Sequence, residues 1–347
     1  PSIKTNGSKE PPLIGGAMPL AKWARFLSVA FATLGGAITL PEDAQAQNYP
    51  DRTIKIIMPF GPGGAGDVFS RAFASELQTR IGQPVVVENK PGAFTLTGGQ
   101  ACAQAAADGY TLCMLPIDAT SLAPFLSDKI AFDPAKDFTP ITRLFFIGQG
   151  LVVHPSLGVN TVADLVALSK NKPDTLSYVA QASQITLFME QFKKTTGADM
   201  RRVPYTAGGQ AAADVLSGHV PIGYFGITNV LQNVEAGQIK FLAVDGSARS
   251  PLLPNVPTMT EAGVSSAPIR AWFGMFGPAG LPKPVIDRVY QEVVEILNTK
   301  AFVDRHMIAR GLEPAILPMA EFKTFLQKDR ADAEQILKTT GLKLVTN

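Results

Sequence analysis

Short apolar runs alternate with stretches of helical periodicity along most of the chain. Apolar runs at 54–58, 85–87 and 111–115 predict strands, and the amphipathic stretch Val68–Ile81 predicts a helix between the first two. The alternation continues with strands expected at 151–153, 176–179, 202–204, 222–225 and 239–244, and helices at 163–170, 186–195 and 210–217. This order predicts an α/β fold with mainly parallel sheets flanked by helices.

The last third of the chain has a different pattern. Prolines at 251, 254 and 257 indicate a loop, after which the apolar run Trp272–Phe276 is expected to act as a hinge segment. A helix is predicted from Pro284, because proline is favoured in the first turn. A second helix is predicted to end at Gly341. Both helices are expected to pack against the rest of the fold rather than to take part in function.

Residues 1–46 are predicted to lie outside the fold. Met18 opens a segment with basic residues at 22 and 25, an apolar stretch at 26–40 and the cleavage site Ala44-Gln45-Ala46. The apolar stretch of 15 residues is shorter than the ~20 that span a bilayer. We therefore expect a signal peptide cleaved after Ala46, export of the mature chain and no membrane-embedded segment. Residues 1–17 precede a plausible initiator and are not expected to belong to the folded protein.

Charge excludes one class of partner. Residues 1–46 hold four of the 31 basic and three of the 29 acidic residues, which leaves 27 against 26 in the exported chain. Such neutrality, without a run of Lys or Arg, argues against a nucleic-acid partner. About 300 residues suffice for two domains, each with its own core.

The two cysteines leave two alternatives open. Cys102 falls on a predicted helix and Cys113 on the strand that follows. In an oxidising compartment they could form a disulfide. They could equally remain buried thiols, because the Cα atoms of a helix and a strand often lie too far apart to be bridged.

The loop after the first strand is the strongest functional signal. It reads Gly61-Pro62-Gly63-Gly64-Ala65-Gly66 and opens the first helix. Backbone N–H groups at a helix N-terminus favour an anion. Asp67 is the expected N-cap of a helix that begins at Val68, worth about 1 kcal/mol. The N–H groups of Gly61, Gly63 and Gly64 are then expected to be free for one carboxylate.

Two other interpretations of this loop remain. Gly61, Gly63 and Gly66 fit G-x-G-x-x-G, and Glu88 follows 22 residues later, as in a nicotinamide-dependent enzyme. Against this, two prolines remove donors from the loop, and Asp67 would repel a pyrophosphate. The other alternative is a tight turn without a ligand, although so many glycines cost folding entropy.

Catalytic chemistry is poorly supported. His154, His219 and His306 lie far apart in sequence and show neither metal-ligand spacing nor a nucleophile motif nearby. We therefore expect no catalytic residue, no metal and no cofactor.

Polar residues that follow predicted strands are candidates for ligand contact, because ligands of open α/β sheets lie beyond the carboxyl ends of strands. Asp118 would repel an anion unless it faces an ammonium or hydroxyl group of the ligand. The candidates are Asp118, Ala119, Ser183, Gln184, Thr186, Tyr205, Thr206 and Thr228.

Several stretches, in order, resemble the Bug family, the periplasmic solute-binding proteins of tripartite tricarboxylate transporters. They include Tyr49-Pro50-Asp51-Arg52, Pro59-Phe60-Gly61-Pro62-Gly63-Gly64, Gly82-Gln83-Pro84-Val85, Asp108-Gly109-Tyr110-Thr111-Leu112, Val203-Pro204-Tyr205 and Gly277-Pro278-Ala279-Gly280. The family's Gly-Ser-x-x-His stretch corresponds to Ala182-Ser183-Gln184-Ile185-Thr186, which keeps the serine and replaces the histidine. Phe94-Thr95 stands where the family often has Gly-Gly.

The resemblance implies a two-lobed, type II binding-protein fold with a ligand cleft between the lobes. One lobe would comprise 47–150 plus 270–347 and the other 151–269. The loop Phe60–Asp67 would hold one carboxylate, and the Ala182–Thr186 stretch would meet the far end of the ligand. The implied function is capture of a small carboxylate, either a di- or tricarboxylate or an aromatic carboxylate, by a monomer that delivers it to membrane transporter subunits. A secreted nicotinamide-dependent enzyme and a ligand-loaded sensor for a receptor kinase are the alternatives.

Overall fold

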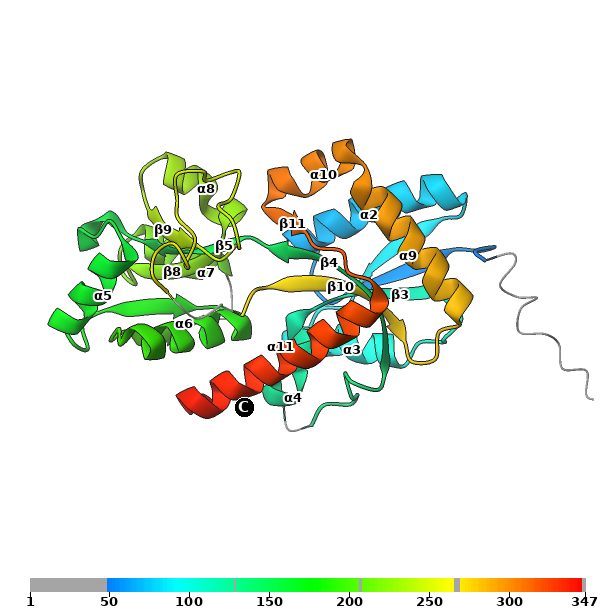
Figure 1. The fold of residues 1–347 in the computed structure, drawn as a ribbon, viewed down its shortest axis with the longest axis horizontal. Helices are drawn as coiled ribbons and strands as arrows, with labels where there is room; N and C mark the ends of the chain where they lie inside the picture. The colour runs from blue at the N-terminus through cyan, green and yellow to red at the C-terminus, as the bar shows by residue number, and fades with distance from the viewer. Residues whose placement is uncertain (1–48, 128, 206–207, 265–268, 345–347) are drawn as a thin grey trace, which may run out of the picture. The chain divides into compact units, whose positions relative to one another are not determined.

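A computed structural model describes residues 49–344, except 128, 206–207 and 265–268 (Figure 1). The predicted signal peptide and the residues before it lie outside this range. The strands are β1 Ile54–Met58, β2 Val85–Asn89, β3 Thr111–Pro116, β4 Phe138–Ile147, β5 Gln149–Val153, β6 Ser177–Ala180, β7 Arg201–Pro204, β8 Ile222–Gly226, β9 Lys240–Val244, β10 Trp272–Pro278 and β11 Leu312–Pro314.

The helices cover these strands on both sides. The α-helices are α2 Ala65–Ile81, α3 Leu96–Ala103, α4 Ala123–Leu126, α5 Val162–Asn171, α6 Ser183–Thr196, α7 Gly208–Leu216, α8 Ile227–Glu235, α9 Lys283–Asn298, α10 Lys300–His306 and α11 Met319–Thr340. Short turns are η2 Ala93–Thr95, η3 Asp118–Leu122, η4 Pro155–Leu157 and η5 Ile308–Arg310, of which η3 is π-helical. Within the described residues, no helix is both long and apolar enough to cross a membrane.

The first sheet has the strand order β11-β4-β10-β3-β1-β2. Its strands alternate side chains between two buried faces, as the period of a strand requires. Ile56 and Met58 of β1 lie in a core with α2 and α9, whereas Ile57 lies in a second core with α3 and α11. This sheet and its helices form the first lobe.

The second sheet has the strand order β7-β6-β8-β5-β9 and forms the second lobe. Leu151 and Val153 of β5 face one apolar core, and Val152 faces another. Both sheets are mixed rather than mainly parallel. The reason is that β10, β4 and β5 run antiparallel to their neighbours. The parallel pairs are those of β1 with β2 and β3 in the first sheet, and of β6 with β7 and β8 in the second.

Two strand segments connect the lobes (Figure 1). Only Gly148 separates the end of β4 from the start of β5, so one extended segment passes from the first sheet into the second. Beside it, the chain returns into β10, and the Ile147 N–H donates to the Ala271 carbonyl at 2.8 Å. The two-lobed α/β fold that the sequence predicts is thus present.

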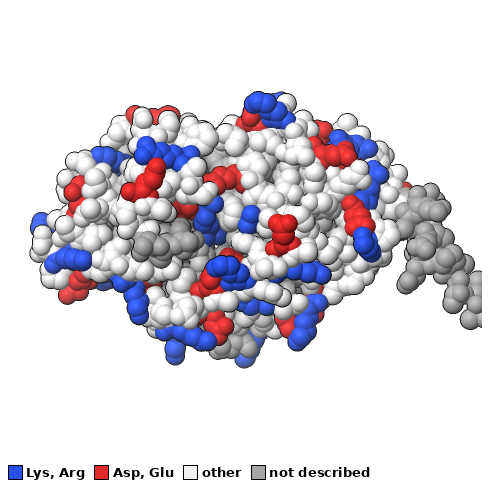
Figure 2. All heavy atoms as spheres, in the orientation of Figure 1, with Lys and Arg blue, Asp and Glu red and all other residues white. Residues whose placement is uncertain are grey.

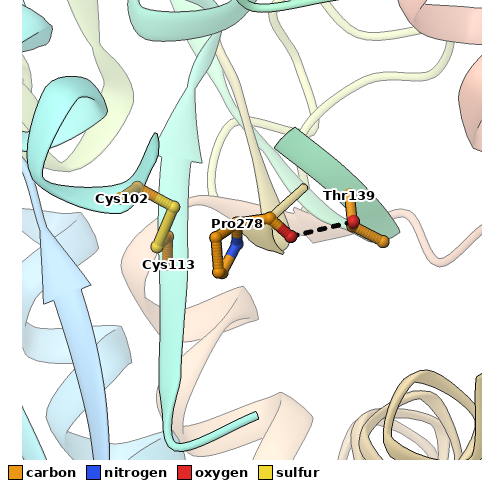
Figure 3. Close-up of a disulfide and its surroundings, with 4 residues drawn as sticks. All are labelled: Cys102, Cys113, Thr139 and Pro278. Carbon is orange, nitrogen blue, oxygen red and sulfur yellow. Dashed lines mark hydrogen bonds between the residues drawn. A yellow bond between two sulfur atoms is a disulfide. The ribbon is translucent and has the colours of Figure 1, made fainter. Parts of the chain in front are cut away.

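A disulfide joins Cys102 of α3 to Cys113 of β3 (Figure 3). Both residues are fully buried, and their Cα atoms lie 6.1 Å apart. Of the two states that the sequence leaves open, a disulfide or two buried thiols, the structure contains the disulfide. Figure 3 also shows the Thr139 hydroxyl donating to the Pro278 carbonyl at 2.9 Å, a contact that ties the ends of β4 and β10 together.

Charged side chains of both signs are interspersed over the described part of the surface seen in Figure 2. Many of them form exposed pairs one helical turn apart, such as Lys283 with Asp287 and Lys338 with Glu334. Pairs of this kind contribute little to stability individually. The face in view therefore carries no extended field of one sign.

Asp329 of α11 predicts a pH dependence of stability. Burial raises the pKa of its carboxyl to about 6, although the Trp272 indole N–H, which donates to Oδ2 at 3.1 Å, opposes the shift. Between pH 4 and 6 the folded protein keeps a proton that the unfolded chain releases, so stability should fall as pH rises through this window. We expect Asp329→Asn to stabilise the protein by roughly 1–2 kcal/mol at pH 7.5 and by about a third of that gain at pH 4.5. Melting curves at the two pH values test this, and an equal gain at both would contradict it.

Candidate ligand-binding site

The glycine loop ends in a helix N-terminus that no side chain caps. Helix α2 begins at Ala65, and its N-cap residue is Gly64, which has no side chain to accept a hydrogen bond. The first N–H groups of a helix have no partner within the helix. The N–H groups of Ala65, Gly66 and Asp67 are therefore available donors at the positive end of the helix dipole.

Asp67 has a different role from the one that the sequence suggests. It is the third residue of α2 rather than its N-cap, and its side chain is almost fully buried. Its Oδ2 accepts from the Gly63 N–H and from Arg71 Nε, each at 3.0 Å, and its Oδ1 accepts from Asn89 Nδ2 at 2.8 Å. Two expectations are corrected: Asp67 does not cap the helix, and the Gly63 N–H is not free for a ligand.

The same contacts hold the loop in place and neutralise its charge. Asn89 also donates to the Phe60 carbonyl at 2.8 Å and accepts from Arg71 Nη2 at 2.7 Å. Burial opposes ionisation of Asp67, but the bonds from Arg71, Asn89 and Gly63 outweigh it and hold the pKa of the carboxyl below its usual value. An ionised Asp67 paired with Arg71 does not leave the loop with an uncompensated negative charge.

Close packing fixes the path of the loop. A Cβ at Gly66 would lie 2.5 Å from Met58 Cε and 3.0 Å from the Phe273 ring, so a side chain there would have to displace the Met58 methyl group and press on the ring. Gly63 has φ +95°, which disfavours any side chain. Phe60 packs against Phe273, with ring centroids 5.9 Å apart, and remains 39% exposed. It thus offers an aromatic surface beside the free N–H groups.

The end of β3 lies beside this loop. Strand β1 pairs with β3 in parallel, with Ile57 opposite Cys113, so the chain after Met58 and the chain after Pro116 leave the sheet at the same edge. The turn η3 follows, and within it Ala119 is fully buried whereas Asp118 remains partly exposed. Burial raises the pKa of Asp118 to about 6, offset in part by a bond from its own backbone N–H.

The second lobe contributes the start of α6. Its N-cap is Ala182, in extended conformation and without a side chain that could accept a bond, so the N–H groups of the first turn are again available. Ser183 is only 8% exposed. Its neighbours are engaged: Gln184 Nε2 donates to the Ile269 carbonyl at 2.5 Å, and the Thr186 hydroxyl donates to the Ala182 carbonyl at 3.0 Å. Thr186 therefore serves its own helix.

Helix α6 faces the first lobe. Leu187 lies in the same apolar cluster as Ile117, Ala119 and Leu122 of the β3–η3 segment. The bond from Gln184 to Ile269, just before β10, adds a second link. The structure therefore brings the end of β3 and the first turn of α6 together across the two lobes.

The remaining candidates are placed less favourably. The Tyr205 hydroxyl donates to Asp214 of its own lobe, a bond that with burial raises its pKa to about 12. The Thr228 hydroxyl donates to the Arg310 carbonyl at 3.2 Å. Arg310 precedes β11, which lies at the opposite edge of the first sheet from β1 and β2. Thr206 lies outside the described residues.

Two residues that position the loop were missed by sequence reasoning. Arg71 and Asn89 hold the loop through Asp67. The parallel pairing of Met58 with Asn89 brings Asn89 to the loop, and no local sequence signal reveals that contact.

The residues proposed for other chemistry have structural partners. Glu88 forms ion pairs with Lys55 at 2.8 Å and with Lys90 at 2.5 Å, so it is not free for a ribose. His154 and His219 bond with neighbouring serine hydroxyls, and His306 packs on Phe302. Among the described residues, no group of three His, Cys, Asp or Glu side chains is arranged to hold a metal.

Two α/β lobes, two connecting strand segments and an uncapped helix N-terminus from each lobe define the class of periplasmic binding proteins. Within it, the chain belongs to the family described as "Tripartite tricarboxylate transporter family receptor", whose sequence profile matches residues 69–342. The resemblance to the Bug family is confirmed: the protein BugT of Bordetella pertussis is 33% identical over 331 residues, which cover 94% of this chain and 100% of BugT.

Solved structures agree with this assignment. R. palustris Rpa4515 with adipate superposes with a TM-score of 0.77 and 28% identity, over 86% of this chain and 100% of that one. The periplasmic binding protein BugD superposes with a TM-score of 0.72 and 26% identity, over 86% of this chain and 100% of BugD. MatC from Rhodopseudomonas palustris with bound malate superposes with a TM-score of 0.70 and 25% identity, over 83% of this chain and 100% of MatC. These similarities include both lobes.

Proposed function

We propose that the protein captures a small carboxylate between its lobes and delivers it to the membrane subunits of a tripartite tricarboxylate-type transporter. The observation that carries the proposal is the pair of uncapped helix N-termini, of α2 and of α6, one from each lobe. Oriented N–H groups bind carboxylate oxygens without a positively charged side chain. The dicarboxylates adipate and malate are present in the structures of the relatives Rpa4515 and MatC.

Capture would proceed by hinge closure about the two connecting segments, at Gly148 and before Trp272. One carboxylate would bind the N–H groups of α2, and the other end of the ligand would meet Ser183 and the first turn of α6. Lobes of 47–150 plus 270–347 and of 151–269 would move as rigid bodies. Binding and release would involve no covalent change, so the protein would not be an enzyme.

The setting of this function is also part of the proposal. The chain would be exported through cleavage after Ala46 and would act in the periplasm as a monomer. Intact-mass analysis of the secreted protein tests the cleavage site, with a chain beginning at Gln47 as the expected result.

A thermal-shift screen of the purified protein tests the function. The panel comprises dicarboxylates, tricarboxylates, aromatic carboxylates and NAD. Ligand at about 100 times its dissociation constant stabilises by ~2.7 kcal/mol, which shifts the melting temperature by several degrees. We expect a shift with at least one carboxylate and none with NAD. A shift with NAD alone would reject the proposal in favour of a nicotinamide enzyme.

Ser183 offers a sharper test at the second lobe. We expect Ser183→Ala to weaken carboxylate binding about tenfold, because a hydrogen bond to a charged group contributes roughly 1.5 kcal/mol. The melting temperature without ligand should stay unchanged. Thr186→Val is the matched control and should leave affinity intact, since the Thr186 hydroxyl bonds its own helix. Calorimetric titration measures both; if Thr186→Val weakened binding more than Ser183→Ala, the assignment at α6 would be wrong.

A further inference from the structure

Three charged side chains meet where the two lobes are joined. Arg270 lies just before β10, in one of the two connecting segments (Figure 1). Its Nη2 lies 2.8 Å from Oε2 of Glu313 on β11, in the first lobe, and 3.6 Å from Oδ1 of Asp245, which directly follows β9 of the second lobe. The guanidinium group also lies over the Phe146 ring, 4.1 Å from its centroid. We call Asp245, Arg270 and Glu313 the hinge cluster.

Burial makes the charges of the hinge cluster count. The Asp245 side chain is 0% exposed and that of Arg270 is 15% exposed. Asp245 is also fixed to β5, because its Oδ1 accepts from the Gln149 N–H at 3.1 Å and its own N–H donates to the Gln149 carbonyl at 2.9 Å. Charges interact more strongly where water is excluded, so the pair of Asp245 and Arg270 should respond to a small movement of the lobes.

The contact between Asp245 and Arg270 is not fully formed. A charge-assisted hydrogen bond between nitrogen and oxygen is about 2.7–2.9 Å long, whereas this gap is 3.6 Å. Among the described residues, Asp245 Oδ2 and Arg270 Nε are buried without a hydrogen-bond partner. Buried polar groups are nearly always paired, so a shift of the lobes that brings the Asp245 carboxylate onto Arg270 would be favourable.

The strand order places the hinge cluster opposite the ligand site. In the first sheet, β4 and β10 lie between β11 and the pair β3–β1, and in the second sheet β5 lies between β9 and the pair β8–β6. Helices α2 and α6 follow β1 and β6. A rotation about the connecting segments that brings the N-termini of α2 and α6 together therefore moves β9 away from β11. Closure of the ligand site thus pulls the hinge cluster apart, and opening brings it together.

We propose that the hinge cluster holds the ligand-free protein open and that carboxylate capture works against it. Arg270 is then a positioning residue, which acts through the angle between the lobes and not through contact with the ligand. Because only the closed form holds both ends of the ligand, the hinge cluster lowers the affinity by lowering the closed fraction. The inference rests on the proposed function, since it presupposes a carboxylate held between α2 and α6.

Asp245→Asn tests the inference by calorimetric titration. The substitution keeps the size of the side chain and an acceptor for the Gln149 N–H, but it removes the charge that attracts Arg270. At pH 7.5 we expect the variant to bind a carboxylate at least about fivefold more tightly than the wild type, at the lower end of usual coupling energies. Glu313→Gln, at the less buried end of the hinge cluster, should act in the same direction and provides the test should Asp245→Asn fail to fold.

Acid should remove the difference between the wild type and Asp245→Asn. The groups that face the Asp245 carboxyl are Arg270, Glu313, the Tyr224 hydroxyl and the Gln149 N–H, and burial outweighs the attraction of Arg270 and raises the pKa of Asp245 to about 6. At pH 5 most of the wild-type protein therefore carries an uncharged Asp245, so the ratio of the two affinities should approach one. Other carboxylates titrate in both proteins and cancel in this ratio. A gain that persists undiminished at pH 5 would overturn the assignment to the charge of Asp245.

Glu292→Gln is the matched control. Glu292 is likewise a buried carboxylate with arginine partners, Arg80 Nε at 2.6 Å and Arg288 Nη2 at 2.7 Å, but all three residues lie on helices of the first lobe. Because these pairs do not differ between open and closed forms, affinity should stay within about twofold of the wild type.

Two kinds of failure are distinguishable. Unchanged or weaker binding in folded Asp245→Asn, or an equal gain in Glu292→Gln, would overturn the inference while the proposed function stands. If neither the wild type nor any variant binds a carboxylate, the proposed function fails and the inference fails with it.

Discussion

Asp67→Ala is expected to weaken carboxylate binding at least 30-fold. The substitution removes the acceptor that positions the Gly63 N–H, Arg71 and Asn89, and it leaves Arg71 without its buried partner. Loss of one member of a hydrogen-bonded charge pair of this kind costs about 2 kcal/mol or more. The free N–H groups at the start of α2 would then no longer be held toward a common point. Calorimetric titration with the carboxylate that gives the largest thermal shift measures the effect.

The control for this prediction lies on the same helix. Ser75→Ala changes an exposed position of α2 outside the Asp67 network and should leave affinity within twofold of the wild type. Melting curves of both variants show whether the fold is retained. Wild-type affinity in folded Asp67→Ala would move the anion site away from the glycine loop.

Loss of the disulfide is expected to cost about 3 kcal/mol of stability. Cys102 and Cys113 are separated by 11 positions in the sequence, and closure of a loop of this size restricts the unfolded chain by about that amount. The double variant Cys102→Ala/Cys113→Ala should therefore unfold several degrees below the wild type. Carboxylate affinity should be unchanged at a temperature where the variant is folded.

Single variants provide an internal check on this bond. Cys102→Ala and Cys113→Ala each break the same disulfide, so each should lose nearly as much stability as the double variant. Additive losses would show instead that the two cysteines act as independent buried thiols.

Strand positions were predictable where apolar runs were short and clearly bounded. The bounds of β1 agree with the prediction, and those of β3 and β6 agree within one residue. Strand β4, the longest, was missed because Pro140 and Arg143 interrupt its apolar run. Proline is tolerated there next to a register shift of the pairing with β10, where the ladder is already irregular. The mixed character of the sheets was missed because the direction in which β5 and β10 pair with their neighbours leaves no mark in the apolar pattern of the strands.

The glycine loop was recognisable as an anion-binding candidate, but the donors within it were not. The sequence suggests Asp67 as a cap because aspartate after a glycine turn is common at that position. In the structure the helix begins at Ala65, and Asp67 reaches back to Gly63 and across to Asn89 on β2. Side-chain contacts between separate elements depend on the packing of the fold, which local patterns do not encode.

A crystal structure of the protein with its tightest-binding carboxylate would test the central claim most directly. The account predicts one carboxylate group bonded to the N–H groups at the start of α2, directly or through one water, at donor–acceptor distances of about 3 Å. The other end of the ligand should meet Ser183 and the first turn of α6. A ligand bound outside the cleft between α2 and α6, or held only by charged side chains, would contradict the account.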